Sequence, residues 1–225
     1  GPLNHSGFWK WNKYSEEGTP GYIMVSATSQ EDVQMVQKLN GKDMTLKYNM
    51  GSYFSQQPER YLYEHGYSSK GLADFTFEID EDMRPFWVAT RFEKTVGYMG
   101  NNSIGVVTMD AQTGEIAEYT IANVPKWIDR IQPHDFIEEQ IDDWGHYIHG
   151  FWSSFTGDGL LEPTPGTSMV FGADGKCYWY VGMSSKGKDE STVGFMLVDS
   201  HNKHARFYKL AGATETAAQS SARGA

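Results

Sequence analysis

Short blocks of apolar, strand-forming residues recur along the chain at a nearly constant interval. Residues 21–26, 105–110 and 194–199 align without gaps, and each block opens with glycine before a run of mostly apolar residues. The first residues of successive blocks are 84 and 89 positions apart. Self-similarity at a fixed spacing is the signature of a repeated structural unit, so we expect three related strands.

A second pair of blocks lies upstream of the last two. Residues 75–87 align with residues 167–179, and both predict a strand, an acidic turn and an aromatic strand. Asp174-Gly175 is a strong hairpin signal, because aspartate and glycine tolerate the positive φ angle of a tight turn. Asp82 has the equivalent place in the earlier block. The order of the blocks predicts that the two nearly complete copies share one topology.

Helical patterns complete the predicted unit. Residues 133–147 carry apolar side chains at helical spacing on one face and acidic side chains on the other. Residues 55–64 begin with a capping serine and end before Gly66, an asymmetry typical of helix ends. We also expect a shorter helix over residues 29–39 and the start of another at residues 213–218.

Together these elements predict an α+β protein of tandem units, each a helix packed on a small antiparallel β-sheet. Residues 3–50 are expected to form the C-terminal part of a first unit plus a connecting helix. Residues 51–132 and 133–211 are expected to form a second and a third unit, and residues 212–225 the start of a further unit's helix. The proline-rich residues 162–166 are expected to be a loop.

One segment carries a family resemblance. Residues 107–116, Val-Thr-Met-Asp-Ala-Gln-Thr-Gly-Glu-Ile, resemble the strand–turn–strand that often closes PepSY domains. The resemblance covers residues 55–121 and, more weakly, 133–210, whereas residues 199–203 lack the Thr-Gly turn. It implies a PepSY-like fold in a membrane-anchored bacterial repeat protein. It also implies a location on the extracytoplasmic side of the membrane, in the cell envelope, and a non-catalytic role in binding or inhibiting proteins.

Composition narrows the possible partners. The 225 residues carry a formal net charge of −10, and such a surface repels phosphate backbones, so nucleic acid is not expected as a partner. The single cysteine, Cys177, excludes an intrachain disulfide. No stretch has the eighteen or so apolar residues that a membrane helix needs. Gly1-Pro2 looks like the remnant of a removed tag, so Leu3 is the expected first native residue.

The best chemical cluster lies on the helix predicted over residues 133–147 and just beyond it. Its members share one helical stripe and include residue types that bind divalent transition metals: Glu138, Asp142, His146 and His149. One helix rarely supplies a complete site, so a solvated acidic face is the favoured interpretation, and we assign no metal, cofactor or catalytic residue. Acidic residues 80–82 lack the ligand pattern of a calcium loop and are expected to be a charged hairpin tip. Asp110 and Asp199 are expected to start turns through Asx hydrogen bonds.

Aromatic side chains are the most distinctive feature of the composition. They cluster in residues 8–11, recur as the pairs Phe86-Trp87 and Tyr178-Trp179, and follow the second helix. Strand alternation turns the members of a pair to opposite faces. We expect most aromatic side chains to lie in the core or between units, and any exposed group to form a protein- or glycan-binding surface.

Three functions fit these observations. The favoured hypothesis is a non-catalytic extracytoplasmic binding or scaffolding module that recognises a protein. The alternative is a hydrolase or metal-dependent enzyme that uses the acidic and histidine residues of the 134–149 helix, for example Glu138 and Asp142. A structural spacer is the third. Membrane contact is expected only through segments beyond residues 1–225, and the oligomeric state is open.

Overall fold

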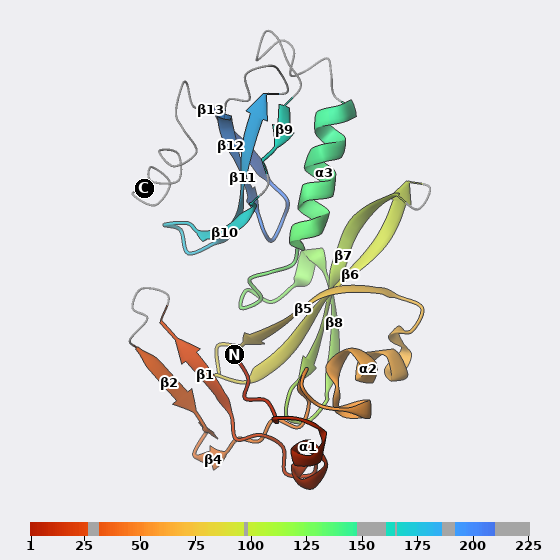
Figure 1. Ribbon diagram of the computed structural model, residues 1–225, viewed down its shortest axis with the longest axis vertical. Helices are drawn as coiled ribbons and strands as arrows, with labels where there is room; N and C mark the ends of the chain where they lie inside the picture. The colour runs from red at the N-terminus through yellow and green to blue at the C-terminus, as the bar shows by residue number, and fades with distance from the viewer. Residues whose placement is uncertain (27–31, 97–98, 148–160, 165, 186–191, 210–225) are drawn as a thin grey trace. The chain divides into compact units, whose positions relative to one another are not determined.

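The computed structural model describes residues 1–26, 32–96, 99–147, 161–164, 166–185 and 192–209 (Figure 1). The chain divides into two compact units. Unit 1 comprises Gly1–Glu93 and Ile104–Ile128, and unit 2 comprises Lys94–Ser103 and Asp129–Ala225. The four-part division predicted from the sequence stays a prediction.

Unit 1 is dominated by a four-stranded antiparallel sheet with strand order β5-β6-β7-β8. Its strands are β5 (Gly71–Ile79), β6 (Pro85–Val96), β7 (Met99–Asp110) and β8 (Ile116–Thr120), of which β6 and β7 extend into unit 2. Two small antiparallel pairs precede the sheet: β1 (Tyr22–Val25) with β2 (Val33–Val36), and β3 (Lys38–Leu39) with β4 (Lys42–Asp43). Its helices are α1 (Phe8–Tyr14), α2 (Pro58–Leu62), the 3-10 turns η1 (Phe54–Gln56) and η3 (Ile121–Asn123), and the π-type turn η2 (Tyr63–Tyr67).

Unit 2 contains α3 (His134–Tyr147) and a five-stranded antiparallel sheet. The strands are β9 (Leu161–Pro163), β10 (Ser168–Phe171), β11 (Cys177–Ser185), β12 (Thr192–Asp199) and β13 (Ala205–Lys209). Strands β10 to β13 follow one another in space as in sequence, and β9 pairs with β11 beside β10.

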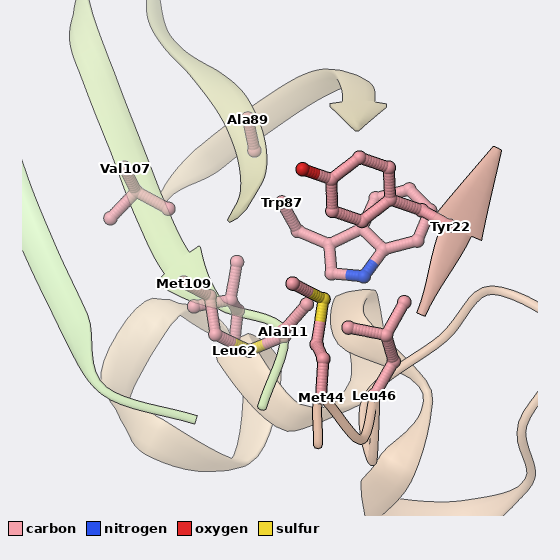
Figure 2. Close-up of a cluster of buried hydrophobic side chains, with 9 residues drawn as sticks. All are labelled: Tyr22, Met44, Leu46, Leu62, Trp87, Ala89, Val107, Met109 and Ala111. Carbon is pink, nitrogen blue, oxygen red and sulfur yellow. The ribbon is translucent and has the colours of Figure 1, made fainter. Parts of the chain in front are cut away.

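Each unit has a buried cluster around a tryptophan. In unit 1 the cluster combines β1, β6, β7, α2 and the segment before α2, as Figure 2 shows: Tyr22, Met44, Leu46, Leu62, Trp87, Ala89, Val107, Met109 and Ala111. In unit 2 it joins α3 to β11 and β12: Ile137, Ile141, Trp179, Val181, Met183, Met196 and Val198. The indole N–H of Trp87 donates to the carbonyl of Tyr48 at 2.9 Å, and that of Trp179 donates to Gln132 at 2.8 Å.

The sequence repeat corresponds to three hairpins: β1–β2, β7–β8 and β12–β13. In each, the glycine that opens the repeated sequence block lies close to the backbone of the partner strand. A Cβ atom on Gly21, Gly105 or Gly194 would lie 1.9, 2.0 or 2.3 Å from the nearest backbone carbonyl oxygen, distances that real Cβ atoms essentially never show. These glycines recur because no side chain fits there.

Aspartates form the turns as the sequence predicts. The Oδ1 atom of Asp110 accepts backbone hydrogen bonds from Gln112 and Thr113 at 2.7 and 2.9 Å. Asp199 accepts equivalent bonds from His201 and Asn202 at 2.8 and 3.2 Å. Their predicted role as Asx-turn residues is therefore confirmed.

Acidic residues also shape the β5–β6 turn. Asp80 accepts hydrogen bonds from the backbone N–H groups of Asp82 and Arg84 at 3.0 and 2.8 Å. Its second carboxylate oxygen pairs with the Arg84 side chain at 2.7 Å. The acidic character of this turn thus has a structural explanation.

The predicted α+β fold of tandem PepSY-like helix-on-sheet units is wrong. The part of the chain that the structure describes is mostly β: 44% of its residues lie in strands, which form four small antiparallel sheets, and 18% lie in helices. The error arose because short helical patterns were given the same weight as the strand blocks, although helices of one or two turns gain little stability from their own hydrogen bonds.

The individual helix predictions fared differently. The helix expected over residues 133–147 is confirmed as α3. The helix expected over residues 29–39 is wrong where the structure describes it, because residues 33–36 form β2 and residues 27–31 lie outside the description. Of the helix expected over residues 55–64, only the five residues of α2 are α-helical.

Two further predictions concern the ends of elements. The side chain of Gln57, not Ser55, caps α2 by accepting a hydrogen bond from the N–H of Arg60 at 2.7 Å. The loop expected at residues 162–166 is wrong in part, because Glu162 and Pro163 belong to strand β9. The helix expected from residue 213 lies outside the described residues.

Candidate binding surfaces

The N-terminal half of α3 holds Glu138, the member of the predicted metal cluster whose side chain the structure describes. The Oε1 atom of Glu138 accepts a hydrogen bond from the hydroxyl of Thr167 at 2.6 Å and lies 3.2 Å from Nε2 of His134. The Nδ1 atom of that imidazole lies 3.0 Å from a carboxylate oxygen of Asp135. Glu138 is therefore placed by a threonine and a histidine that the sequence did not single out, although the i, i+4 spacing of His134 and Glu138 was visible.

The other members of the predicted cluster cannot be placed beside Glu138. Asp142 and His146 belong to α3, but their side chains lie outside the described part of the structure, as does all of His149. Within the described residues, no three His, Cys, Asp or Glu side chains are grouped so that they could hold a metal ion.

An open hollow of ≈ 680 Å³ lies beside Glu138. It is lined by His134, Asp135, Glu138, Glu139, Pro163, Thr164, Gly166 and Thr167. A hydrolase that used a threonine nucleophile would need its hydroxyl hydrogen-bonded to a base such as the imidazole. Here the hydroxyl of Thr167 donates to a carboxylate, and the imidazole lies between two carboxylates. The geometry is that of a hydrogen-bonded helix start rather than of a nucleophile and its base.

The aromatic pairs of the repeat are largely structural. Trp87 and Trp179 are buried. Phe86 packs against Trp127 with ring centroids 5.0 Å apart, and the hydroxyl of Tyr178 donates to Asp174 at 2.7 Å. The pairs therefore serve the cores and their margins, as expected. The aromatic side chains near residues 8–11 behave differently and are considered below.

The hairpin β1–β2 presents an apolar face that nothing covers within the described residues. In its register, Ile23 pairs with Met35 and Val25 pairs with Val33, so these four side chains share one face. Val25 is 58% exposed, Val33 55% and Met35 49%, and Ile23 is half-buried. We call these four residues the β1–β2 face.

The opposite face of the same hairpin is anchored in the core of unit 1. Tyr22 is fully buried, and its ring centroid lies 5.8 Å from that of Phe77. Its hydroxyl donates a hydrogen bond to the carbonyl of Met83 at 3.0 Å. Its cross-strand partner Val36 packs against the same cluster. The hairpin is thus held in place by one face, and the other face is left to solvent.

The equivalent positions of the other two hairpins are buried. Counting from the shared glycine, Ile23 corresponds to Val107 and Met196, and Val25 corresponds to Met109 and Val198. Val107 and Met109 are 0% exposed, and both belong to the cluster that contains Leu62 of α2. Met196 and Val198 are 2% and 3% exposed and cluster with two isoleucines of α3. A helix thus contributes to covering this face in both copies.

The position of Met35 on this face carries a different type of side chain in each hairpin. Met35 corresponds to Phe207, which packs against the unit 2 cluster, and to Glu118, which lies in an ion network. Glu118 accepts hydrogen bonds from Tyr67 at 2.9 Å and Lys70 at 3.3 Å, and pairs with Arg91. Burial raises the pKa of Glu118, but these hydrogen bonds and positive charges outweigh burial and lower the pKa overall. Burial and the bond to Glu118 raise the pKa of Tyr67 to about 12.

Comparison of the chain with models of protein families, with curated proteins and with solved structures found no match. The PepSY-like resemblance therefore stays a prediction made from one short segment. No helix within the described ranges is both long enough and apolar enough to cross a membrane.

Proposed function

We propose that the chain is a non-catalytic binding module, and that the β1–β2 face docks an amphipathic helix of a partner protein. The observation that supports this proposal most directly is the contrast in exposure among the three repeated hairpins. The same face is at most 3% exposed at Val107, Met109, Met196 and Val198, yet Val25 is 58% exposed.

The repeat indicates what kind of occupant fits. In unit 2 the covering side chains are Ile137 and Ile141, which lie one helical turn apart on α3. Aliphatic side chains at positions i and i+4 of a helix can pack against the apolar side chains on one face of a two-stranded hairpin. Lys38 and Lys42 lie in the β3–β4 pair that follows β2, where Lys38 also pairs with Asp43 at 3.9 Å. These lysines favour a helix with acidic residues beside its apolar stripe, as α3 has.

The alternative function, a hydrolase or metal-dependent enzyme on α3, has less support. Of its proposed residues, the side chain described is Glu138, and its nearest partners are a hydroxyl donor and His134. That the chain lacks catalytic activity stays a prediction, as do its extracytoplasmic location and its membership of a membrane-anchored parent protein.

A binding titration tests the proposal. A synthetic peptide of residues 133–147, which carries the isoleucine pair of α3, should bind the purified chain weakly, because four aliphatic side chains offer a small surface. Met35→Asp should weaken binding at least about tenfold, since it would bury a carboxylate. Gln34→Asp adds the same charge to the opposite face of β2 and should leave binding unchanged.

The control peptide carries Asp in place of both isoleucines. Binding of this peptide as tight as that of the parent peptide, or equal effects of Met35→Asp and Gln34→Asp, would argue that the β1–β2 face does not dock a helix.

A further inference from the structure

Trp11 anchors helix α1 to the rest of unit 1. Trp11 is buried, and its indole N–H donates to Oε1 of Gln56 at 2.8 Å. The amide of Gln56 donates in turn to the carbonyl of Ser15 at 2.8 Å, just after the helix ends. The ring centroid of Trp11 also lies 5.4 Å from that of Tyr53 and 5.6 Å from that of Phe54. These contacts fix α1 against the segment that leads into α2.

The remaining aromatic side chains of this region are turned to solvent. Phe8 contacts Trp9, Tyr53 and Phe54 with ring centroids 5.5, 5.2 and 6.4 Å apart. Trp9 is nevertheless 82% exposed and Phe54 57% exposed, and Phe8 and Tyr53 are exposed as well. We call these four residues the aromatic surface. A contiguous exposed apolar patch on a folded protein usually marks an interaction site.

The backbone at Phe54 supports the same view. Its φ angle is +52°, in the left-handed region that a bulky residue rarely adopts. Such a conformation is strained and persists where the surroundings enforce it, often at functional sites. Here it accompanies an aromatic side chain that is mostly exposed, so the strain is not offset by burial of the ring.

The segments that carry these rings also carry positive charges. Lys10 and Lys13 belong to α1, and neither forms an ion pair with the residues that the structure describes. The guanidinium of Arg60 lies 6.0 Å from the Phe54 ring centroid while it also pairs with Glu64. Helix α1 contains no acidic residue, although Glu16 and Glu17 follow it, in a chain whose net charge is −10. The helix that carries Phe8 and Trp9 is therefore itself positively charged.

From this combination we infer that the aromatic surface and the two lysines of α1 bind the interfacial region of an anionic lipid bilayer. Tryptophan, tyrosine and phenylalanine beside lysine are the residues that settle at the boundary between headgroups and acyl chains. A protein-binding hot spot is usually depleted of lysine, which makes a protein partner the weaker fit. The inference concerns different residues from the β1–β2 face and differs from the expectation that this chain itself makes no membrane contact.

Vesicle co-sedimentation tests the inference. The whole chain should sediment with phosphatidylcholine vesicles that contain phosphatidylglycerol, and much less with phosphatidylcholine alone. Lys10→Ala and Lys13→Ala should each weaken binding about fivefold, and added salt should do the same. The double variant Trp9→Ala/Phe54→Gly should lose at least about tenfold in affinity, because it removes the two most exposed rings.

The double variant is suited to the test because it is expected to fold: Trp9 is mostly exposed, and glycine adopts the φ angle of residue 54 without strain. Phe171→Ala in β10 is the control, since that ring is 66% exposed but lies in unit 2. Absence of vesicle binding by the wild type, equal binding to neutral and anionic vesicles, or unchanged binding by the double variant would overturn the inference. Loss of vesicle binding on Met35→Asp would not be expected, so the failures of the two proposals are distinguishable.

Discussion

The hairpins β1–β2 and β12–β13 have the same backbone arrangement, but one face is exposed in the first and buried in the second. In both, a glycine lies against a backbone carbonyl of the partner strand, and the residues that follow it pair in the same register. Val198 in one hairpin is 3% exposed, whereas Val25 at the equivalent position of the other is 58% exposed. The comparison teaches that the local sequence specifies the hairpin, while the burial of its face depends on whether another element covers it.

The comparison predicts first that the three repeated glycines are indispensable. Gly105→Ala and Gly194→Ala should each destabilise the chain by about 4 kcal/mol, because the added Cβ would overlap a backbone oxygen. Chemical denaturation followed by circular dichroism measures the change. Gly175→Ala is the control: its φ angle is positive, but nothing lies within 4 Å, so it should cost about 1 kcal/mol. Losses at Gly105 and Gly194 as small as the loss at Gly175, or a large loss at only one of the two, would contradict the proposed equivalence.

The buried indole bonds provide the next largest effect. Trp87→Phe and Trp179→Phe should each cost about 2–3 kcal/mol, since each loses a hydrogen bond to a backbone carbonyl and leaves a small void. If the equivalent hydrogen bonds of Trp87 and Trp179 reflect a shared architecture of the two units, the two variants should lose similar amounts of stability. A large loss at one position and none at the other, in the same denaturation assay, would weaken that relation.

A matched pair of valines tests the difference in coverage. Val198→Ala should destabilise the chain by about 2 kcal/mol, because it leaves a cavity in the unit 2 cluster. Val25→Ala removes the same atoms from the same position of the repeat but should change stability by less than about 0.5 kcal/mol. Equal losses would mean that the β1–β2 face is already covered in solution, contrary to the account given above.

The smallest expected effect concerns Glu118, which occupies in the β7–β8 hairpin the position that Met35 has in β1–β2. Its folded pKa lies below its ordinary value of 4.5, so the ionised carboxylate contributes stability that is present above pH 4.5. That contribution is lost as the pH falls through the folded pKa. Because the side chain is 37% exposed, Glu118→Gln should cost no more than about 1 kcal/mol at pH 7. The difference from the wild type should shrink toward zero in acid; a difference that stays constant down to pH 3 would count against the ion network.

The features that could be predicted from the sequence are those with a local cause. Gly105 and Asp110 predicted a strand and a turn, because glycine permits close backbone packing and aspartate accepts hydrogen bonds from the N–H groups of the next few residues. The strand–turn–strand of residues 75–87 followed from the same turn chemistry. Helix α3 was predictable because its apolar spacing extends over several turns.

Features that depend on distant contacts were missed. Residues 33–36 were expected to be helical, although the repeat itself places a strand there. The interval from Ser26 to Asp32 is one residue longer than that from Asp110 to Glu115, which hid the correspondence, yet the N–H of Ser26 still donates to Asp32 as that of Asp110 donates to Glu115. The exposure of Trp9 and Val25 could not be predicted, because tryptophan and valine side chains are usually largely buried.

The most direct test of the central proposal is a methyl-detected NMR titration of the whole chain with the peptide of residues 133–147. We predict that the largest chemical-shift changes fall on Ile23, Val25, Val33 and Met35, and that Met35→Asp abolishes them. Changes confined to the methyl groups of unit 2, such as Met196 and Val198, would show that the peptide only replaces α3. That result, or no change at any methyl group, would contradict a docking role for the β1–β2 face.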